Sequence, residues 1–409
     1  MSGLAERLVC LLGLASMIAI AWACSSDRRH VPWRTVAWGL ALQLSLGVAL
    51  LKTPLGALFF DGMNGLVSAL LSYTDVGVRF VFGALVDTGF SFIVNVLPII
   101  IFMGSVFAVL YHLGVMHRLV NALAFALSRT MRVSGAESLA AVANLFLGMV
   151  ESALIVRPYL ERMTRSELFT LMTLGMATVA GSVLIAYVGM LGGDYAGHLA
   201  TASLLSLPAG LLVAKVMVPE RETPATTAAG GSRLERTAVN PIDAAAQGAL
   251  AGLRLAAYVG ALLVAFVGLI AMLNGILASL GAWVGVPELT FQRILGFLLA
   301  PLAWLMGVPW QDAPQVGALL GVKTVLNEFL AYRELALLME QGALAPRSGL
   351  IASYALCGFA NFGSLAILLG GIGGLAPSRR AEVARYGLRS ILSGSLAAFM
   401  TACVAGLLL

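Results

Sequence analysis

Two acidic residues stand inside apolar segments, where a charge is costly. Glu151 lies in the apolar stretch 134–165, and Glu328 lies in the stretch 312–345. A carboxylate at membrane depth is expensive unless it is hydrogen-bonded, paired or functional. The structural alternative for each is a buried ion pair, with Arg157 or with Lys323. Because the two acids occupy similar segments in two halves of the chain, we expect them to have a functional role.

A second polar group follows in the Gly-rich segment Gly358–Ser364 (GFANFGS). Asn361 and Ser364 stand three residues apart, a spacing that shares one face of a helix, and Phe359 comes just before them. In an unwound stretch the freed carbonyls are also available to a ligand or a cation. The alternative is that small polar side chains hold helices together, as Ser and Asn commonly do in membranes.

Neutral oxygens occur beside two further glycines. Asn144 precedes Gly148, and Thr178 precedes Gly181, so side-chain oxygens stand next to backbone carbonyls that a glycine can free. Oxygen ligands suit hard cations, which favours Na+ and argues against a transition metal. Helix capping by Asn144 is the competing interpretation.

Composition defines the setting of these residues. The chain has 409 residues, of which 60% are hydrophobic and 11% charged, and its mean hydropathy is +0.94. A soluble domain carries about 25% charged residues, so the composition argues against a cytosolic enzyme, a disordered chain or a coiled coil. It predicts an all-α polytopic membrane protein. The net charge of +5 does not indicate nucleic acid, because the basic residues lie in short loops between apolar segments.

The hydropathy pattern predicts eight transmembrane helices. The strongly apolar stretches lie near 8–24, 36–51, 92–111, 168–191, 196–217, 255–281, 348–373 and 388–409. Residues 54–72 and 114–127 are amphipathic or short, and we expect interfacial helices there. We interpret the first stretch as a span and not as a cleaved signal peptide, because Glu6 interrupts its basic flank.

Basic clusters indicate the topology of these spans. If the clusters face the cytoplasm, as the positive-inside rule requires, both termini lie outside. The clusters are Arg28, Arg29 and Arg34; Arg118, Arg129 and Arg132; Arg162 and Arg165; Lys215, Arg221, Arg233 and Arg236; and Arg379, Arg380, Arg385 and Arg389.

The polar interruptions predict two unusual elements. Residues 134–165 and 312–345 are apolar but carry ionisable groups in mid-segment, so we expect re-entrant hairpins buried in protein. Each is followed by a Gly-interrupted span, with breaks at Ala177–Val183 (ATVAGSV) and at Gly358–Ser364. Such a pair in matching places of two halves is typical of a transporter built from inverted repeats. An intramembrane enzyme is the less favoured alternative, because no nucleophile, metal cluster or His partner accompanies the two acids.

Three long motifs resemble the signatures of the concentrative nucleoside transporter family, in particular its bacterial NupC-like members. They are Gly148–Tyr159 (GMVESALIVRPY), Gly307–Tyr332 (GVPWQDAPQVGALLGVKTVLNEFLAY) and Tyr354–Arg380 (YALCGFANFGSLAILLGGIGGLAPSRR). The resemblance implies a homotrimer in which a hairpin-containing part moves like an elevator. It also implies nucleoside uptake driven by Na+ or by protons across the inner membrane of a bacterium, with no other cofactor.

The resemblance assigns roles to individual positions. Glu328, Asn361 and Ser364 match ribose-binding residues, and Phe359 lines the same pocket. Glu151 matches an acidic residue at the first hairpin's tip, and Val183 matches a residue beside the base. Asn144 and Thr178 match side-chain Na+ ligands, while Leu147 and Val179 match positions that offer backbone carbonyls. It divides the chain into scaffold regions 1–133 and 253–311, transport repeats 134–217 and 312–409, and a cytoplasmic linker 218–252.

One departure from the family pattern concerns the nucleobase. Two positions that are commonly Gln with Ser or Thr are here Met149 and Val150. The ribose side therefore keeps its polar groups, whereas the base side has lost hydrogen-bonding partners. This leaves a purine preference, a broader selectivity, a modified nucleoside or another small metabolite as alternatives. A channel or a non-transporting membrane sensor is the alternative outside the carrier class.

Overall fold

The computed structural model describes residues 3–87, 89, 91–226, 238–283, 285–286 and 288–409. Within these residues every regular element is helical, with nineteen α-helices and two short 3₁₀ helices. The predicted all-α architecture is confirmed. The predicted cytoplasmic linker 218–252 includes residues outside this description, among them Arg233 and Arg236.

Eight helical segments of the described chain have the length and composition of membrane spans. They are Ala5–Ala23, Trp33–Lys52, Pro54–Asp87, Phe92–His112, Arg165–Leu191, Tyr195–Met217, Pro241–Trp283 and Pro377–Leu408. The number of spans, eight, matches the prediction, but one of the predicted spans is replaced by another segment. The stretch 348–373 is absent because it is divided into α17 (Pro346–Leu356) and α18 (Phe362–Leu375). The segment from Pro54 takes its place, because the expected short interfacial helix there is the first part of the 29-residue α3 (Pro54–Phe82).

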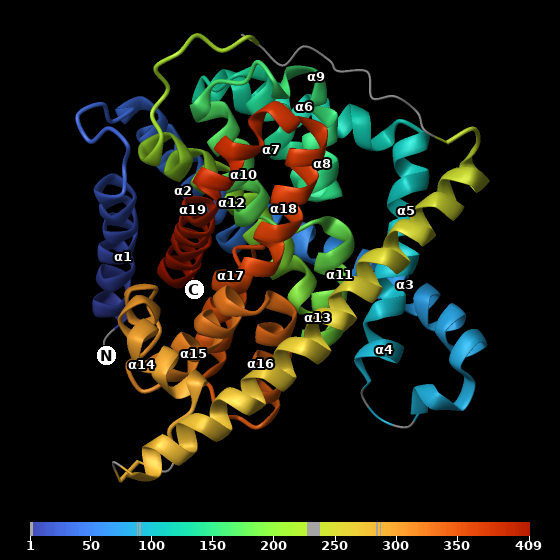
Figure 1. Ribbon diagram of the computed structural model, residues 1–409, viewed down its shortest axis with the longest axis vertical. Helices are drawn as coiled ribbons and strands as arrows, with labels where there is room; N and C mark the ends of the chain where they lie inside the picture. Colours follow the sequence, from blue (N-terminus) through green and yellow to red (C-terminus); the bar gives the residue numbers. More distant parts are fainter. Residues whose placement is uncertain (1–2, 88, 90, 227–237, 284, 287) are drawn as a thin grey trace.

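The helices form an exposed outer set and a buried inner set. The outer set is α1 (Gly3–Ala23), α2 (Trp33–Lys52), α3, α5 (Leu97–His112) and the 43-residue α13 (Pro241–Trp283), which crosses the molecule obliquely (Figure 1). In the most apolar 18-residue stretch of α13, only 6% of the residues are buried. The inner set is α10 (Arg165–Ala177), α11 (Gly181–Leu191), α12 (Tyr195–Met217) and α19 (Arg380–Leu408). In the corresponding 18-residue stretch of α12, 94% of the residues are buried. The exposed outer helices are apolar, as a surface facing lipid or another subunit requires.

Shorter helices complete the chain at the edges of these two sets. They are α4 (Phe92–Asn95), α6 (Val115–Met131) and α14 (Phe291–Leu305), with 3₁₀ helices at Gly83–Asp87 and Pro377–Arg379. In α6 the buried residues Met116, Val120, Ala124 and Ser128 recur every four positions. This one-sided burial agrees with the amphipathic helix expected near 114–127.

Glycine brings α5 and α13 into close contact. A Cβ atom at Gly104 would lie 2.6 Å from the carbonyl oxygen of Gly248, and one at Gly252 would lie 2.7 Å from the carbonyl oxygen of Ile100. Gly248 and Gly252 form a GxxxG pair, which lets two helix backbones approach where side chains would separate them.

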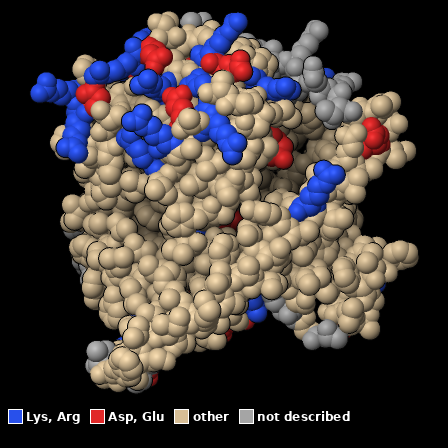
Figure 2. Space-filling model, viewed as in Figure 1, with Lys and Arg blue, Asp and Glu red and all other residues tan. Residues whose placement is uncertain are grey.

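On the face drawn in Figure 2, most of the charged side chains gather at one end of the molecule. Arg389 donates to the carbonyl oxygens of Cys24 and Met217, and Arg379 donates to that of Met163. Arg221 pairs with Asp27. These contacts bring the basic clusters near residues 28–34, 162–165, 215–221 and 379–389 to the same end, hereafter the basic end.

The two chain termini meet at the opposite end. Arg347 donates to the carbonyl oxygen of Gly406 at 2.6 Å and forms an ion pair with Glu6 at 3.5 Å. The 29-residue α19 connects this terminal end to the basic end, where it begins at Arg380.

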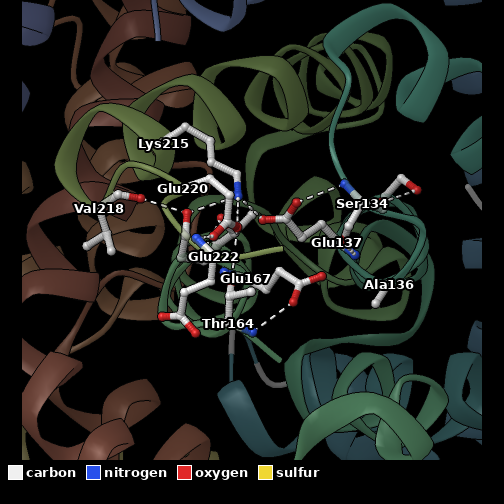
Figure 3. A network of polar contacts seen from close by, with 12 residues as sticks. Ser134, Ala136, Glu137, Thr164, Glu167, Lys215, Val218, Glu220 and Glu222 are labelled. Atoms are coloured by element: carbon white, nitrogen blue, oxygen red, sulfur yellow. Dashed lines mark hydrogen bonds and ion pairs between the residues drawn. The ribbon is translucent and has the colours of Figure 1, made fainter. Parts of the chain in front are cut away.

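A buried lysine organises the basic end (Figure 3). Lys215 Nζ lies 2.5 Å from Glu137 Oε1 and 3.3 Å from Glu220 Oε2, and it donates to Ser166 Oγ at 2.9 Å. Glu137 and Glu167 are also the third residues of capping boxes begun by Ser134 and Thr164. One ammonium thus ties the first turns of α7 (Gly135–Leu147) and α10 to the end of α12, which fixes where both helices start.

Two helical hairpins enter the protein from opposite ends. Hairpin 1 consists of α7, α8 (Met149–Ile155) and α9 (Arg157–Leu160). It starts beside Lys215 and returns to the basic end, where Arg379 donates to the carbonyl oxygen of Leu160. Hairpin 2 consists of α15 (Ala313–Val325) and α16 (Glu328–Glu340), and Asp312 closes it by accepting from Ala345 N and Ser348 Oγ. Since these residues adjoin Arg347, hairpin 2 opens at the terminal end.

The two halves of the chain repeat this arrangement. Each hairpin is followed by a broken pair of helices, α10/α11 or α17/α18, and then by a long inner helix, α12 or α19. The first hairpin helices pack in the same way, α7 on α10 and α15 on α17. The second hairpin helices contact their own half and also pack across the halves, α8 on α18 and α16 on α11. This exchange, with the opposite entry of the hairpins, agrees with the predicted inverted repeat.

Candidate substrate and cation site

Four helix N-termini meet around one cavity of about 1320 Å³. They belong to α8, α11, α16 and α18, whose N-cap residues are Gly148, Ala180, Asn327 and Asn361. Each N-terminus carries about half a positive charge and unpaired N–H groups. The protein interior at this point therefore stabilises carboxylates and the oxygens of a polar ligand.

Glycine permits the two broken helices to cross at their breaks. A Cβ atom at Gly358, in the α17/α18 break, would lie 2.9 Å from the carbonyl oxygen of Met176 and 3.0 Å from that of Ala177, at the end of α10. A Cβ atom at Gly148, at the tip of hairpin 1, would lie 3.5 Å from the Cβ atom of Ala180 in the other break. The hairpin tip and both breaks thus meet at the cavity wall.

Glu328 is held by two neutral donors. Tyr187 donates to Oε1 at 2.8 Å, and Asn361 donates to Oε2 at 2.6 Å. The side chain is 3% exposed and lies at the first position of α16, where the helix dipole favours a negative charge. Among the described residues Glu328 forms no ion pair with Lys323, so the alternative of a structural salt bridge is not what the structure shows.

Asn361 connects the second repeat's two helix starts. Its Oδ1 accepts from the backbone N–H of Ser364 at 2.7 Å, which caps α18, while its Nδ2 donates to Glu328. Ser364 and Phe359 line the same cavity. The predicted set Glu328, Phe359, Asn361 and Ser364 is therefore assembled on one wall.

The opposite wall comes from the first repeat. Met149, Val150 and Glu151 form the first turn of α8, and Val183 lies in the first turn of α11; all four line the cavity. Glu151 is exposed to the cavity, and none of the described ion pairs joins it to Arg157, which lines the cavity as well. Met149 is buried and Val150 is half-buried. This wall thus offers one carboxylate within an otherwise apolar surface.

The candidate cation ligands lie behind the tip of hairpin 1. Asn144 Nδ2 donates to the carbonyl oxygen of Leu174 at 2.8 Å and to Thr178 Oγ1 at 2.6 Å, while Ser152 Oγ lies 3.5 Å from Asn144 Oδ1. Asn144 and Thr178 are buried. Asn144 therefore joins two helices instead of capping its own, which argues against the capping interpretation.

The donor set at this point fits a hard cation. Rotation of the Asn144 amide by 180° would present Oδ1 to Thr178, which completes a pair of neutral oxygens. Leu147 ends α7, where the last carbonyls lack helical partners. The carbonyl oxygen of Val179, in the α10/α11 break, accepts a long hydrogen bond of 3.4 Å from Ser203.

The cavity extends from this centre to the basic end. Its lining includes Arg157, Glu161 and Arg162, which are exposed. The carbonyl oxygen of Glu161 accepts from Arg379, a member of a basic cluster. The site is therefore open toward the basic end in this conformation, and Figure 2 shows the molecule hollowed on that side.

Sequence reasoning missed three residues of the site. Tyr187 supplies one of the two donors to Glu328, and its ring stacks on Tyr332 with centroids 4.4 Å apart. Asn327 caps α16 and Phe329 follows Glu328, and both line the cavity. The available signal for Tyr187 was its hydroxyl group inside the otherwise apolar half-helix GSVLIAYVGML, because a buried hydroxyl needs a partner.

The comparisons with known proteins identify this arrangement as that of a nucleoside transporter. The Na+-dependent nucleoside transporter family matches through its C-terminal part at residues 198–406 and its N-terminal part at residues 12–85. The family described as "Gate: Nucleoside recognition" matches residues 93–194. The chain belongs to the concentrative nucleoside transporter family and is a NupC-like member of it. It is thus a multi-pass membrane transporter for nucleosides and not an enzyme.

Relatives and solved structures agree with this membership. Nucleoside permease NupC of Helicobacter pylori is 40% identical over 98% of this chain and 98% of its own length. The rat sodium/nucleoside cotransporter 1 is 40% identical over 98% of this chain and 64% of its own length. The structure of CNTnw in an inward-facing substrate-bound state superposes with a TM-score of 0.92 at 44% identity, covering 98% of each chain.

Proposed function

We propose that this protein imports nucleosides by Na+ symport, with the ribose bound by the second repeat and the base by the first. The observation that carries the proposal is the Glu328 carboxylate, which Tyr187 and Asn361 hold at the wall of a cavity where four helices begin. Its remaining lone pairs would accept from sugar hydroxyls, and Ser364 lies in the first turn of the adjacent helix α18. In such a buried site a ligand that lacks those hydroxyls leaves polar groups unpaired.

The base-facing wall supports a preference based on shape. Met149 and Val150 offer no hydrogen-bonding side-chain groups, so the first repeat contacts the flat face or edge of a base mainly through apolar surface and Val183. Glu151 remains as the polar group of this wall. We propose that this favours purines or a broad range of bases. A modified nucleoside or another small metabolite is the alternative within the carrier class.

Na+ is the coupling ion that the donor set favours. An ion bound by Asn144, Thr178 and the carbonyls of Leu147 and Val179 would join the end of α7 to the α10/α11 break. Since Met149, Val150 and Glu151 follow at the same hairpin tip, ordering that tip would assemble the base-facing wall. Ion and nucleoside would then each raise the affinity for the other, as linkage requires. Proton coupling through Glu151 or Glu328 is the alternative.

We also propose the arrangement in the membrane. With the basic end in the cytoplasm, both termini lie outside and the cavity of this conformation faces inward. The exposed apolar outer helices supply surface for a homotrimer in a bacterial inner membrane, while hairpins 1 and 2 with the inner helices form the moving part. A channel or a sensor with this fold would not accumulate its ligand against a gradient.

The test is thermal stabilisation of the purified protein by nucleosides, free bases and sugars, in NaCl and in choline chloride of equal ionic strength. A ligand at a hundred times its Kd adds about 2.7 kcal/mol of apparent stability. We expect nucleosides to stabilise the protein in NaCl, and free bases and free ribose to stabilise it much less. Stabilisation at low pH without Na+ would indicate proton coupling instead.

Two variants test the assignment of the ribose. Glu328→Gln and Asn361→Ala are expected to weaken nucleoside binding by roughly a hundredfold or more while the protein stays folded, because each leaves a buried polar group without its partner. Glu340→Gln is the matched control, since Glu340 lies on the same helix α16 and is exposed. Unchanged nucleoside affinity in either site variant would refute the ribose assignment.

A further inference from the structure

Lys323 is a buried ammonium group that the site described above does not use. Its side chain is 1% exposed, and Nζ donates to the carbonyl oxygen of Ala355 at 2.9 Å. The ring of Phe399 lies 6.0 Å from it. Among the described residues no carboxylate lies within 4.0 Å of Nζ. The two oxygens of Glu328 accept from Tyr187 and Asn361 instead. A buried charge without a paired counter-ion is expensive, which calls for a compensating role.

The repeat places Lys323 where the other half has Asn144. Asn144 lies four residues before Gly148, the N-cap of the second helix of hairpin 1. Lys323 lies four residues before Asn327, the N-cap of the second helix of hairpin 2.

The hydrogen-bond acceptors of these two side chains correspond as well. Leu174 lies six residues before Ala180, the N-cap of α11, and Ala355 lies six residues before Asn361, the N-cap of α18. Asn144 donates to the carbonyl oxygen of Leu174, and Lys323 donates to that of Ala355.

The electrostatic demand at both positions is the same. α10 and α17 end inside the protein at Ala177 and Leu356, so each points the negative end of its dipole and its last carbonyls at this position. In the second repeat the chain itself supplies a positive charge there. In the first repeat the corresponding side chain, Asn144, is a neutral amide, so the chain supplies no positive charge there.

We infer that Lys323 is a tethered cation that occupies, in the second repeat, the place which a coupling ion takes in the first. The ammonium keeps the α17/α18 break and the tip of hairpin 2 ordered without an ion. The ribose-binding wall is then preformed, whereas the base-binding wall is completed only with Na+. One ion suffices for each nucleoside. This inference rests on the proposed Na+ site at Asn144 and Thr178.

The test measures how many Na+ ions the folded protein binds. The melting temperature is recorded against Na+ concentration at constant ionic strength, with and without nucleoside. Lys323→Gln keeps a donor for Ala355 but removes the charge, and we expect the Na+ dependence to steepen from about one ion to about two. Nucleoside affinity at low Na+ should fall roughly tenfold or more, and Lys323→Arg should retain the wild-type slope.

The controls separate this inference from the proposed function. Lys52→Gln removes an exposed lysine at the end of α2 and is expected to leave the slope unchanged. Lys323→Asn provides a second neutral variant with room for an ion, in case the first does not fold. A slope near one in a folded neutral variant overturns the inference while the wild-type response to Na+ and nucleoside stands. Absence of that wild-type response overturns the proposed function instead.

Discussion

At the scale of single residues, the buried carboxylate of Glu328 is stabilised by neutral hydrogen-bond donors and not by a cationic side chain. Glu328 receives one hydrogen bond from an aromatic hydroxyl and one from an amide, and it stands at a helix N-terminus. An arginine or lysine partner would satisfy the charge but would also occupy the carboxylate. Neutral donors at fixed positions leave acceptor capacity directed at the cavity, where a ligand hydroxyl can use it.

A substitution at Tyr187 tests whether the neutral donors to Glu328 matter for nucleoside binding. Tyr187→Phe keeps the ring against Tyr332 and Phe329 but removes the donor to Glu328 Oε1. A hydrogen bond to a charged group contributes about 1.5–3 kcal/mol, so we expect nucleoside affinity to fall by roughly tenfold to a hundredfold in a titration of the purified protein.

The matched control for this substitution is Tyr332→Phe. Tyr332 stacks on Tyr187 but donates to the carbonyl oxygen of Ser353, away from the carboxylate. It should lower the melting temperature with little effect on nucleoside affinity. Equal losses of affinity in the two variants would show that the stack matters and that the hydroxyl of Tyr187 does not.

At the scale of elements, the site depends on interrupting helices at four places. An unbroken helix satisfies its own backbone and offers nothing to a ligand at mid-length. Breaking α10/α11 and α17/α18 and folding two hairpins creates free helix ends, and the repeat brings them to one point. The crossing of the breaks requires a residue without a Cβ atom, and Gly358 provides it.

Gly358→Ala should disturb this crossing. Its Cβ atom would lie 2.9 Å from the carbonyl oxygen of Met176 and 3.0 Å from that of Ala177, which is closer than van der Waals contact. Backbone atoms cannot rotate away from such a contact as a side chain can. We expect a loss of about 1–3 kcal/mol of stability, together with weaker Na+-dependent stabilisation by nucleoside. Thermal melting with and without Na+ measures both effects.

Gly374→Ala provides the comparison for that experiment. Gly374 lies in α18, and a Cβ atom there would meet nothing within 4 Å. In an exposed helix position alanine is more favourable than glycine by about 1 kcal/mol, so this variant should be as stable as the wild type or more so. If Gly358→Ala behaved in the same way, close contact at the breaks would not be what forms the site.

At the scale of the whole molecule, the residues that orient the protein in the membrane are separate from those that form the site. The basic clusters gather at one end and give the molecule an orientation, while the apolar outer helices provide its lipid or subunit surface (Figures 1 and 2). The buried inner helices carry the hairpins and the site. The cavity extends from the centre toward the basic end, where Arg157, Glu161 and Arg162 line it. An opening toward one side is what an alternating-access carrier shows in one of its states.

The orientation of the protein in the membrane can be measured by chemical labelling of the native residue Cys24, without introducing a new cysteine. Of the four free cysteines, Cys10, Cys357 and Cys403 are buried, whereas Cys24 is exposed at the basic end, where Arg389 binds its carbonyl oxygen. A membrane-impermeant maleimide should label the wild-type protein in everted membrane vesicles and leave it unlabelled in intact cells. Cys24→Ala should abolish the signal. Labelling in intact cells would place the basic end outside and reverse the proposed topology.

Much of this architecture could be predicted from the sequence because membrane insertion is governed by local composition. Apolar length predicts spans, and arginine placement predicts which loops share a side. Ionisable residues inside apolar stretches indicate hairpins, since lipid does not tolerate them. For the same reason Glu151 and Glu328 could be named as candidate site residues, while Asn361 and Ser364 were indicated by the Gly-rich break in which they lie. The extent of α3 could not, because amphipathic patterning does not show where a helix ends.

Only the tertiary structure decided which of these groups meet and what they bind to. Tyr187 and Glu328 are 141 residues apart, and no local pattern predicts that a hydroxyl in α11 supplies a donor to hairpin 2. Likewise, Lys323 is a candidate partner of Glu328 by sequence proximity, but folding turns it toward the end of α17. Sequence determines which groups must find partners in a dry interior, whereas the packing of the two repeats determines which partners are within reach.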